Sequence, residues 1–174
     1  MPTEFITDSD LYERAIAPIA QAQKFVWIGT ADIKDMYVKD GHGAKPLLAV
    51  LDTLVRKGVQ VRLVHAKEPG PHFRDTFDKY PRLWEQMERV LCPRVHFKHI
   101  VIDGIFAYTG SANLTGAGLG IKSDRRRNFE AGIVTTDPQF IDAIMKQFDT
   151  LWMGAHCKDC GRREFCGDPV KSFS

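Results

Sequence analysis

The 174-residue chain has no long apolar run, and its charges nearly cancel. No stretch approaches the roughly 18 consecutive apolar residues that a membrane-spanning helix needs. The opening segment, MPTEFITDSD, contains acidic residues and no apolar run, which argues against a secretory signal. Lys and Arg number 24 against 22 Asp and Glu, and a net charge of +2 excludes a basic, histone-like coat. We therefore expect a soluble, cytoplasmic protein whose contacts with polyanions depend on local clusters of charge.

Helical and strand-like apolar patterns alternate along the chain. Helical segments are expected at 9–24, 47–58, 73–90 and 137–152, with Pro81 interrupting the third. Strands are expected at 25–29, 59–65, 95–102, 105–109 and 129–135, with turn chemistry at 37–45 and a Gly-rich loop at 110–127. This order predicts an α/β fold with a mixed β-sheet flanked by helices. We expect one domain at 1–153 and a cysteine-rich tail at 154–174.

One short run of residues combines groups that can handle a phosphate. In VHFKHIVID, His96 and Lys98 are two residues apart, so on a strand both side chains point to the same face. Asp103 closes that strand, and Ser111 and Asn113 follow in the next loop, so the run reads H-x-K-x(4)-D-x(6)-G-S-x-N. These side chains supply donors for phosphate oxygens, and the imidazole can act as a nucleophile or a proton carrier.

This pattern resembles the signature of the phospholipase D superfamily, which is H-x-K-x(4)-D followed by Gly-Ser and then Asn. Here the second part reads GSANLT, and Asn128-x-Glu130 in RRRNFEAGIV resembles the acidic position of the family's next strand. LLAVLDTLVRKGVQVRLV and the opening helix with FVWIG also resemble the family scaffold, so the resemblance covers about residues 5–153. It implies a phospholipase D-like catalytic domain with one motif per chain.

The resemblance also implies a mechanism without a metal ion. In the family, one His attacks the phosphorus to form a phosphohistidine, a second His protonates the leaving oxygen, and water releases the product. Carried over, His96 is the nucleophile or acid, and Lys98 and Asn113 hold the non-bridging oxygens with help from Ser111. Glu130 would orient the imidazole and fix its tautomer.

Two points of the signature remain: the role of Asp103 and the source of the second histidine. Asp103 belongs to the catalytic motif, but at a tight turn its carboxylate is expected to bond backbone amides. The sequence contains one copy of the motif, so the second His is expected from another chain in a C2 homodimer. The family's short bacterial members with a single motif are built in this way. His99 is three residues from His96, so we expect it to face away and to be structural.

Arg125, Arg126 and Arg127 stand between the GSAN loop and the Glu130 strand. A charge run of this kind is often only a solvated loop. Its position near the expected site also suits contacts with the backbone of a polyanion.

The four cysteines form an organised set. Cys157, Cys160 and Cys166 give the spacing C-x(2)-C-x(5)-C, and Cys92 precedes His96 by four residues. In an intracellular protein this spacing favours a structural zinc site with four thiolate ligands, although an iron–sulfur cluster uses the same ligands. Two disulfides or free thiols are the alternative.

The sequence therefore favours a metal-independent phosphodiesterase that acts as a homodimer, with nucleic acid as the substrate and an endonuclease activity. This choice of substrate depends on the arginine run and on the lack of an amphipathic helix with a basic face. Phospholipid hydrolysis or transfer is the alternative within the same chemistry. A nucleic-acid-binding module without turnover is the alternative from another class.

Overall fold

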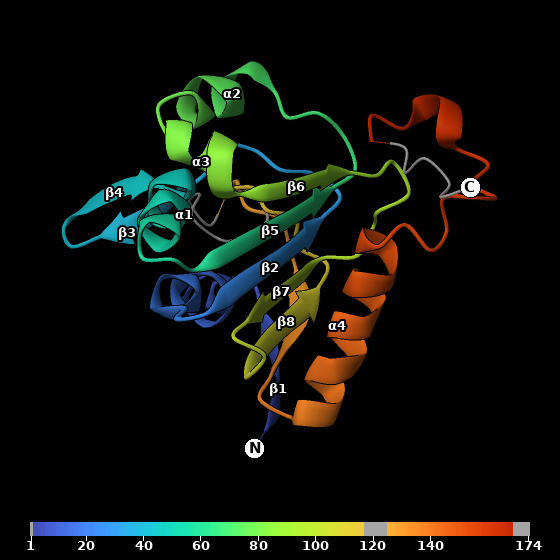
Figure 1. The fold of residues 1–174 in the computed structure, drawn as a ribbon. Coiled ribbons are helices and arrows are strands. Elements are labelled where there is room, and N and C mark those ends of the chain that lie inside the picture. The colour runs from blue at the N-terminus through green and yellow to red at the C-terminus, as the bar shows by residue number, and fades with distance from the viewer. Residues whose placement is uncertain (1, 117–124, 169–174) are drawn as a thin grey trace.

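The computed structural model describes residues 2–116 and 125–168 and is built around a seven-stranded mixed sheet (Figure 1). The strand order is β1-β9-β8-β7-β2-β5-β6. Strands β2, β5 and β6, at one end of this order, are parallel, whereas β7, β8, β9 and β1 pair antiparallel. Their bounds are Thr3–Thr7 (β1), Phe25–Thr30 (β2), Gln60–His65 (β5), Glu88–Leu91 (β6), His99–Ile102 (β7), Phe106–Gly110 (β8) and Ala131–Thr135 (β9). The expected α/β fold with a mixed sheet is confirmed.

Helices cover both faces of the sheet. One face packs against α1, α2 and α3, which span Leu47–Arg56, Pro71–Phe77 and Pro81–Gln86. The other face is covered by α4, Pro138–Trp152, which lies along β7 and β8 (Figure 1). The Asp137 side chain caps α4 by accepting the N–H groups of Gln139 and Phe140, and Pro138 fits the first helical turn.

Strand β2 shows why both faces need cover. Val26 and Ile28 point into the core beneath α1, while Trp27, between them, points to the α4 side. The Trp27 ring stacks on Phe148 of α4 with ring centroids 5.1 Å apart. A strand that is apolar on both faces is stable only between two layers, and this fixes the centre of the sheet.

The first and third expected helices differ from the structure. Residues 9–24 form a π-helical turn at Tyr12–Ile16 and a 3₁₀ turn at Ala17–Gln21, because Pro18 cannot donate a helical hydrogen bond. The segment 73–90 divides at Pro81 as expected, but it ends in strand β6, whose residues alternate in burial. The helical prediction for its last residues was therefore wrong.

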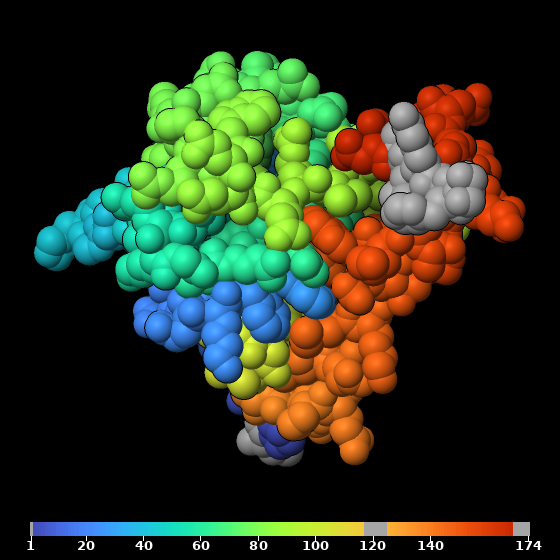
Figure 2. Space-filling model, viewed as in Figure 1, coloured from blue at the N-terminus to red at the C-terminus, as the bar shows by residue number. Residues whose placement is uncertain are grey.

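Several strand predictions also need correction. The turn chemistry at 37–45 is the tip of a hairpin formed by β3, Tyr37–Asp40, and β4, Gly43–Pro46. Its tip holds Gly41 at a φ of 58°. Strand β1, a five-residue edge strand that pairs with β9, was not predicted from the sequence. In Figure 2 the hairpin projects from one side of the molecule and the cysteine-rich tail lies at the opposite side, beside the end of α4.

Within the part of the chain that the structure describes, no helix is both long and apolar enough to cross a membrane.

Candidate active site

His96 and Lys98 lie just before β7 in an extended segment, not within a strand that begins at residue 95 as expected. The strand starts only at His99, because the pairing of β7 with β2 begins there, at Gly29. The two side chains nevertheless converge. Lys98 Nζ donates to the backbone oxygen of His96 at 2.7 Å and lies 3.2 Å from His96 Nδ1. An ammonium group has only donors, so Nδ1 is an acceptor in this arrangement.

The pair combines an accessible imidazole with an enclosed cation. His96 is exposed, whereas Lys98 is only 7% exposed. Burial lowers the pKa of Lys98, and the nearby Glu130 carboxylate opposes this shift in part. A phosphate group that reached His96 would therefore meet a poorly hydrated positive charge, which attracts an anion more strongly than a solvated lysine does.

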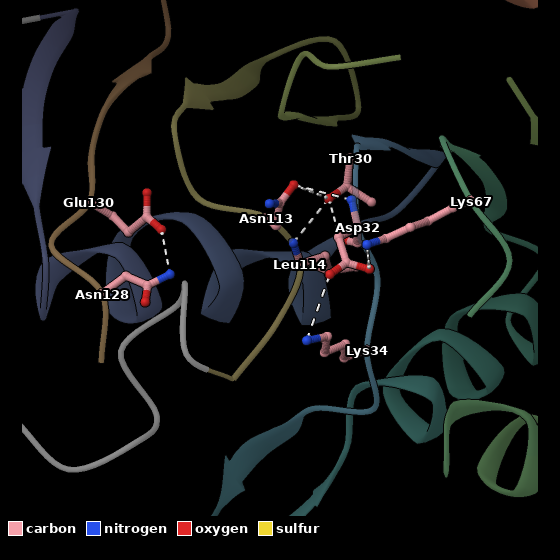
Figure 3. Close-up of polar contacts among 8 residues, drawn as sticks. All are labelled: Thr30, Asp32, Lys34, Lys67, Asn113, Leu114, Asn128 and Glu130. Carbon is pink, nitrogen blue, oxygen red and sulfur yellow. Dashed lines mark hydrogen bonds and ion pairs between the residues drawn. The ribbon is translucent and has the colours of Figure 1, made fainter. Parts of the chain in front are cut away.

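Ser111 and Glu130 face each other at the ends of β8 and β9. The Ser111 hydroxyl donates to the Glu130 carboxylate and accepts the N–H of Ala131 at 3.1 Å. Asn128 Nδ2 donates to Glu130 Oε1 at 3.2 Å (Figure 3). Among residues 2–116 and 125–168, no hydrogen bond joins Glu130 to the His96 ring. Orientation of His96 by Glu130 stays a prediction.

Asn113 is fixed by the end of β2. Its Oδ1 accepts the N–H of Asp32 at 3.2 Å and faces the Thr30 hydroxyl at 3.4 Å (Figure 3). Thr30 accepts the N–H of Leu114 at 3.0 Å and donates to the backbone oxygen of Asp32 at 2.7 Å. Because the amide oxygen of Asn113 is occupied, its NH₂ group is the part that can donate to a substrate.

Thr30 and Asp32 were not among the site residues predicted from the sequence. Thr30 is 1% exposed and joins the end of β2 to the GSAN loop. The Asp32 carboxylate pairs with Lys67 Nζ at 3.4 Å and Lys34 Nζ at 3.8 Å. Their position in the sequence could have indicated a role in the site, because both residues follow the buried strand FVWIG where the next loop begins.

Asp103 lies at the other end of β7, away from these side chains. Its carboxylate accepts the backbone N–H groups of Gln23, Lys24 and Phe25 at 2.8, 2.7 and 2.9 Å. Burial alone would raise the pKa of Asp103, but the three N–H donors outweigh it, so the pKa lies below the ordinary value. Asp103 therefore anchors the entry to β2, as a backbone-bonding group and not as a substrate contact.

His99 points to the opposite face from His96. It is buried, its Nε2 lies 2.8 Å from Oε1 of Gln147 on α4, and its ring stacks on Phe97. Arg125 and Arg126 are exposed and Arg127 is half-buried, at the start of the segment that leads to Glu130. Contact of these arginines with a substrate backbone stays a prediction.

A match to a family model shows which family the chain belongs to. Residues 15–152 match the model described as "Cardiolipin synthase, PLD-like domain". The chain belongs to the phospholipase D-like family. The matched residues include His96, Lys98, Asn113 and Glu130, so the candidate site of this phospholipase D-like domain lies inside the match.

Solved structures show the same fold at low sequence identity. NucT from Helicobacter pylori is 15% identical, with a TM-score of 0.65, and the match covers 87% of this chain and 95% of that one. A phospholipase D family member, Nuc from Salmonella typhimurium, is 14% identical, with a TM-score of 0.60 and coverage of 86% and 94%. Phosphatidylserine synthase from Haemophilus influenzae Rd KW20 is 15% identical, with a TM-score of 0.60, but only 38% of it is covered, against 86% of this chain. Comparison with curated protein sequences gives no match.

The four cysteines converge next to this phospholipase D-like domain. All four line one hollow of about 220 Å³, and none is in a disulfide. Within residues 2–116 and 125–168, however, no group of three or more His, Cys, Asp or Glu side chains is arranged to hold a metal ion. The sequence correctly predicted that the thiols gather, but the geometry does not support the zinc site as it stands. Three of them lie beyond residue 152, outside the family match.

Proposed function

We propose that this protein is a phosphodiesterase of the phospholipase D type in which His96 performs the covalent step without a metal ion. The observation that carries the proposal is the approach of Lys98 Nζ to His96 Nδ1, 3.2 Å, beside an accessible imidazole. A positive charge next to an exposed imidazole is suited to binding a phosphate at the atom that must attack it.

In the proposed reaction, a nitrogen of His96 attacks the phosphorus of a diester and expels one alcohol oxygen, which takes a proton from a second imidazole. Lys98 and the NH₂ group of Asn113 stabilise the charge on the non-bridging oxygens, and Ser111 assists. Water then attacks the phosphohistidine and gives a proton to the second imidazole, which lost one in the first step. The phosphomonoester leaves and both imidazoles are restored. Attack through Nε2 requires a proton on Nδ1, so binding of the phosphate must first draw Lys98 away from that nitrogen.

The second imidazole is proposed to come from a second copy of the chain. The sequence has one copy of the full signature H-x-K-x(4)-D. His65 and His99 are buried at 0% and 6% exposure, so neither can reach a bound substrate. A C2 homodimer with both His96 residues near its axis would supply the pair. Analytical ultracentrifugation tests this: a purely monomeric protein with full activity would rule the dimer out.

Nucleic acid is the proposed substrate. Arg125 and Arg126 are exposed near the Glu130 strand, and the exposed Lys34 and Lys67 lie beside Asn113. A site bordered by these four basic side chains suits the successive phosphates of a nucleic-acid strand. The matches also favour this choice, because they cover nearly all of the nuclease-type neighbours NucT and Nuc but 38% of phosphatidylserine synthase. Phospholipid remains the alternative substrate, and the cytoplasmic location stays a prediction.

The deciding experiment is cleavage of single- and double-stranded DNA in the presence of EDTA, with His96→Ala purified and assayed in parallel. We expect cleavage by the wild-type protein and its loss in the variant. Absence of cleavage by both, with hydrolysis of a phospholipid diester that depends on His96, would change the substrate but keep the chemistry. DNA binding by both proteins without turnover on any diester would support the binding module.

A further inference from the structure

The part of the tail that the structure describes after α4, residues 153–168, has no apolar core of its own. In this part only Gly154, Cys157, Cys160 and Cys166 are not exposed. Its large apolar side chains remain outside, with Met153 at 69% and Phe165 at 60% exposure. Ordering a backbone segment costs conformational entropy, which buried apolar area normally offsets. This tail must be held by some other interaction.

The three cysteines of the tail line the same hollow as Cys92, which lies 65 or more residues earlier in the chain. Short turns present two of them, since the N–H of Cys157 donates to Gly154 O at 2.9 Å and the N–H of Cys160 to Cys157 O at 3.3 Å. The third, Cys166, donates to Leu91 O at 3.8 Å. Four thiols from two segments therefore surround a single hollow.

Few other contacts hold the tail near the domain. Asp168 accepts the N–H of Leu91 at 2.7 Å, and Arg94 donates to Cys160 Sγ at 3.7 Å. Because residues 153–168 carry no buried apolar side chain, a shift toward Cys92 disrupts no apolar packing among them.

We propose that Cys92, Cys157, Cys160 and Cys166 bind one zinc ion as a tetrahedral four-thiolate site that fastens the tail to the domain. Binding draws the sulfur atoms in from the wall of the hollow. Each thiol replaces its S–H bond with an S–Zn bond and releases its proton to solvent. Four donors around one centre match the needs of a single tetrahedral ion, whereas two disulfides need only two separate pairs.

The surroundings of the hollow suit this ion. Four thiolates and Zn²⁺ carry a net charge of −2, and the side chains of Arg94 and Arg163 line the same hollow. Arg163 also donates to Cys157 O at 3.2 Å, which holds a positive charge beside the C-x(2)-C turn. Zinc would also tie down the turn at Pro93 and Arg94, between Cys92 and His96, without taking part in the chemistry.

The test is the metal content of the purified full-length chain, which is measured without reference to activity. We expect about one zinc per chain by elemental analysis, and loss of at least about 10-fold in retained zinc for Cys157→Ser and Cys160→Ser. His156→Ala is the matched control, because His156 lines the hollow but is not a proposed ligand. It should keep its zinc. Replacement with cobalt(II) should give the visible absorption of a tetrahedral thiolate site in the wild-type protein and not in Cys157→Ser.

Three results would overturn the proposal. The first is four titratable thiols in a protein that takes up neither zinc nor cobalt(II). The second is no titratable thiol in the unreduced, denatured chain, which would identify disulfides. The third is iron with a brown colour, which would identify an iron–sulfur cluster. Because metal content is independent of diester cleavage, failure of this proposal is distinguishable from failure of the proposed phosphodiesterase activity.

Discussion

The candidate active site and the cysteine-rich tail lie close together in the folded chain, because Phe97, between His96 and Lys98, lines the same hollow as the cysteines. The two regions are stabilised in different ways. The site residues stand at the ends of buried strands, and hydrogen bonds with the Thr30 hydroxyl and the Asp32 N–H hold Asn113 and its neighbour Leu114 in place. Residues 153–168 of the tail have backbone turns but no buried apolar side chain. Packing therefore positions the first region, whereas the second depends on what joins its thiols. This contrast predicts that mutations of the same kind have different consequences in the two regions.

The largest expected effect on stability comes from matched Phe→Ala substitutions. Phe148 is 0% exposed, and its ring lies between Trp27 and Trp152. Phe148→Ala should lower the free energy of unfolding by about 3–5 kcal/mol, because it leaves a cavity under α4. Phe165→Ala in the tail should change it by less than about 0.5 kcal/mol. Urea denaturation measures both, and similar losses in the two variants would break the comparison.

Removal of the enclosed charge should reduce catalysis. Lys98→Met keeps an unbranched side chain in a buried position but removes the ammonium beside His96. The rate of diester cleavage should fall about 10²–10³-fold, which corresponds to about 2.7–4 kcal/mol of transition-state stabilisation. Lys34→Met, at an exposed position on the border, is the control and should mainly raise KM. Equal effects on kcat in both variants would argue against a special role for Lys98.

A smaller effect is expected from Thr30, which acts on the reaction only through Asn113. Thr30→Val removes the hydroxyl that joins Leu114 and Asp32, and should lower kcat about 10-fold and stability by about 1–2 kcal/mol. Thr30→Ser should restore most of the activity. In an Asn113→Ala background, Thr30→Val should cost little further activity, because the positioned group is already absent. Fully additive losses would indicate a general structural role.

The smallest expected effect is on stability in acid. Burial lowers the pKa of both His65 and His99, so the folded state keeps them neutral while the unfolded chain takes up protons near pH 6.5. The free energy of unfolding should therefore fall as the pH drops from about 7.5 to about 5.5. His99→Gln should flatten this dependence, and His72→Gln, at an exposed position, should not. Urea titrations across this range provide the measurement.

The contrast between the two regions also explains how far the sequence could predict the molecule. The strands FVWIGT and QVRLVH and helix α4 were predictable because their apolar periodicity coincides with burial in the core. Strand β1 was not, since a five-residue edge strand with Phe5 exposed has almost no burial pattern. Strand β6 was assigned to a helix because its four residues continue the apolar spacing of the segment before it.

In the candidate site, too, the residues that could be predicted were those with a local sequence pattern. His96, Lys98, Ser111, Asn113 and Glu130 could be named from a spacing that the family preserves. Thr30 could not be found in this way, because its contribution depends on which strand lies beside β7, and that is a property of the sheet order. Asp103 shows the reverse case. It belongs to the motif in sequence, yet its partners are backbone amides 78–80 residues away.

The central claim is that His96 forms a covalent bond to phosphorus, and it can be tested by trapping the intermediate. The protein would react briefly with a DNA substrate in EDTA, be denatured at alkaline pH, and be digested for mass spectrometry. We predict a phosphorus adduct on the peptide that contains His96, together with its absence from His96→Ala. Cleavage that continues in His96→Ala, or that proceeds in the wild-type protein with no adduct on this peptide, would contradict the account.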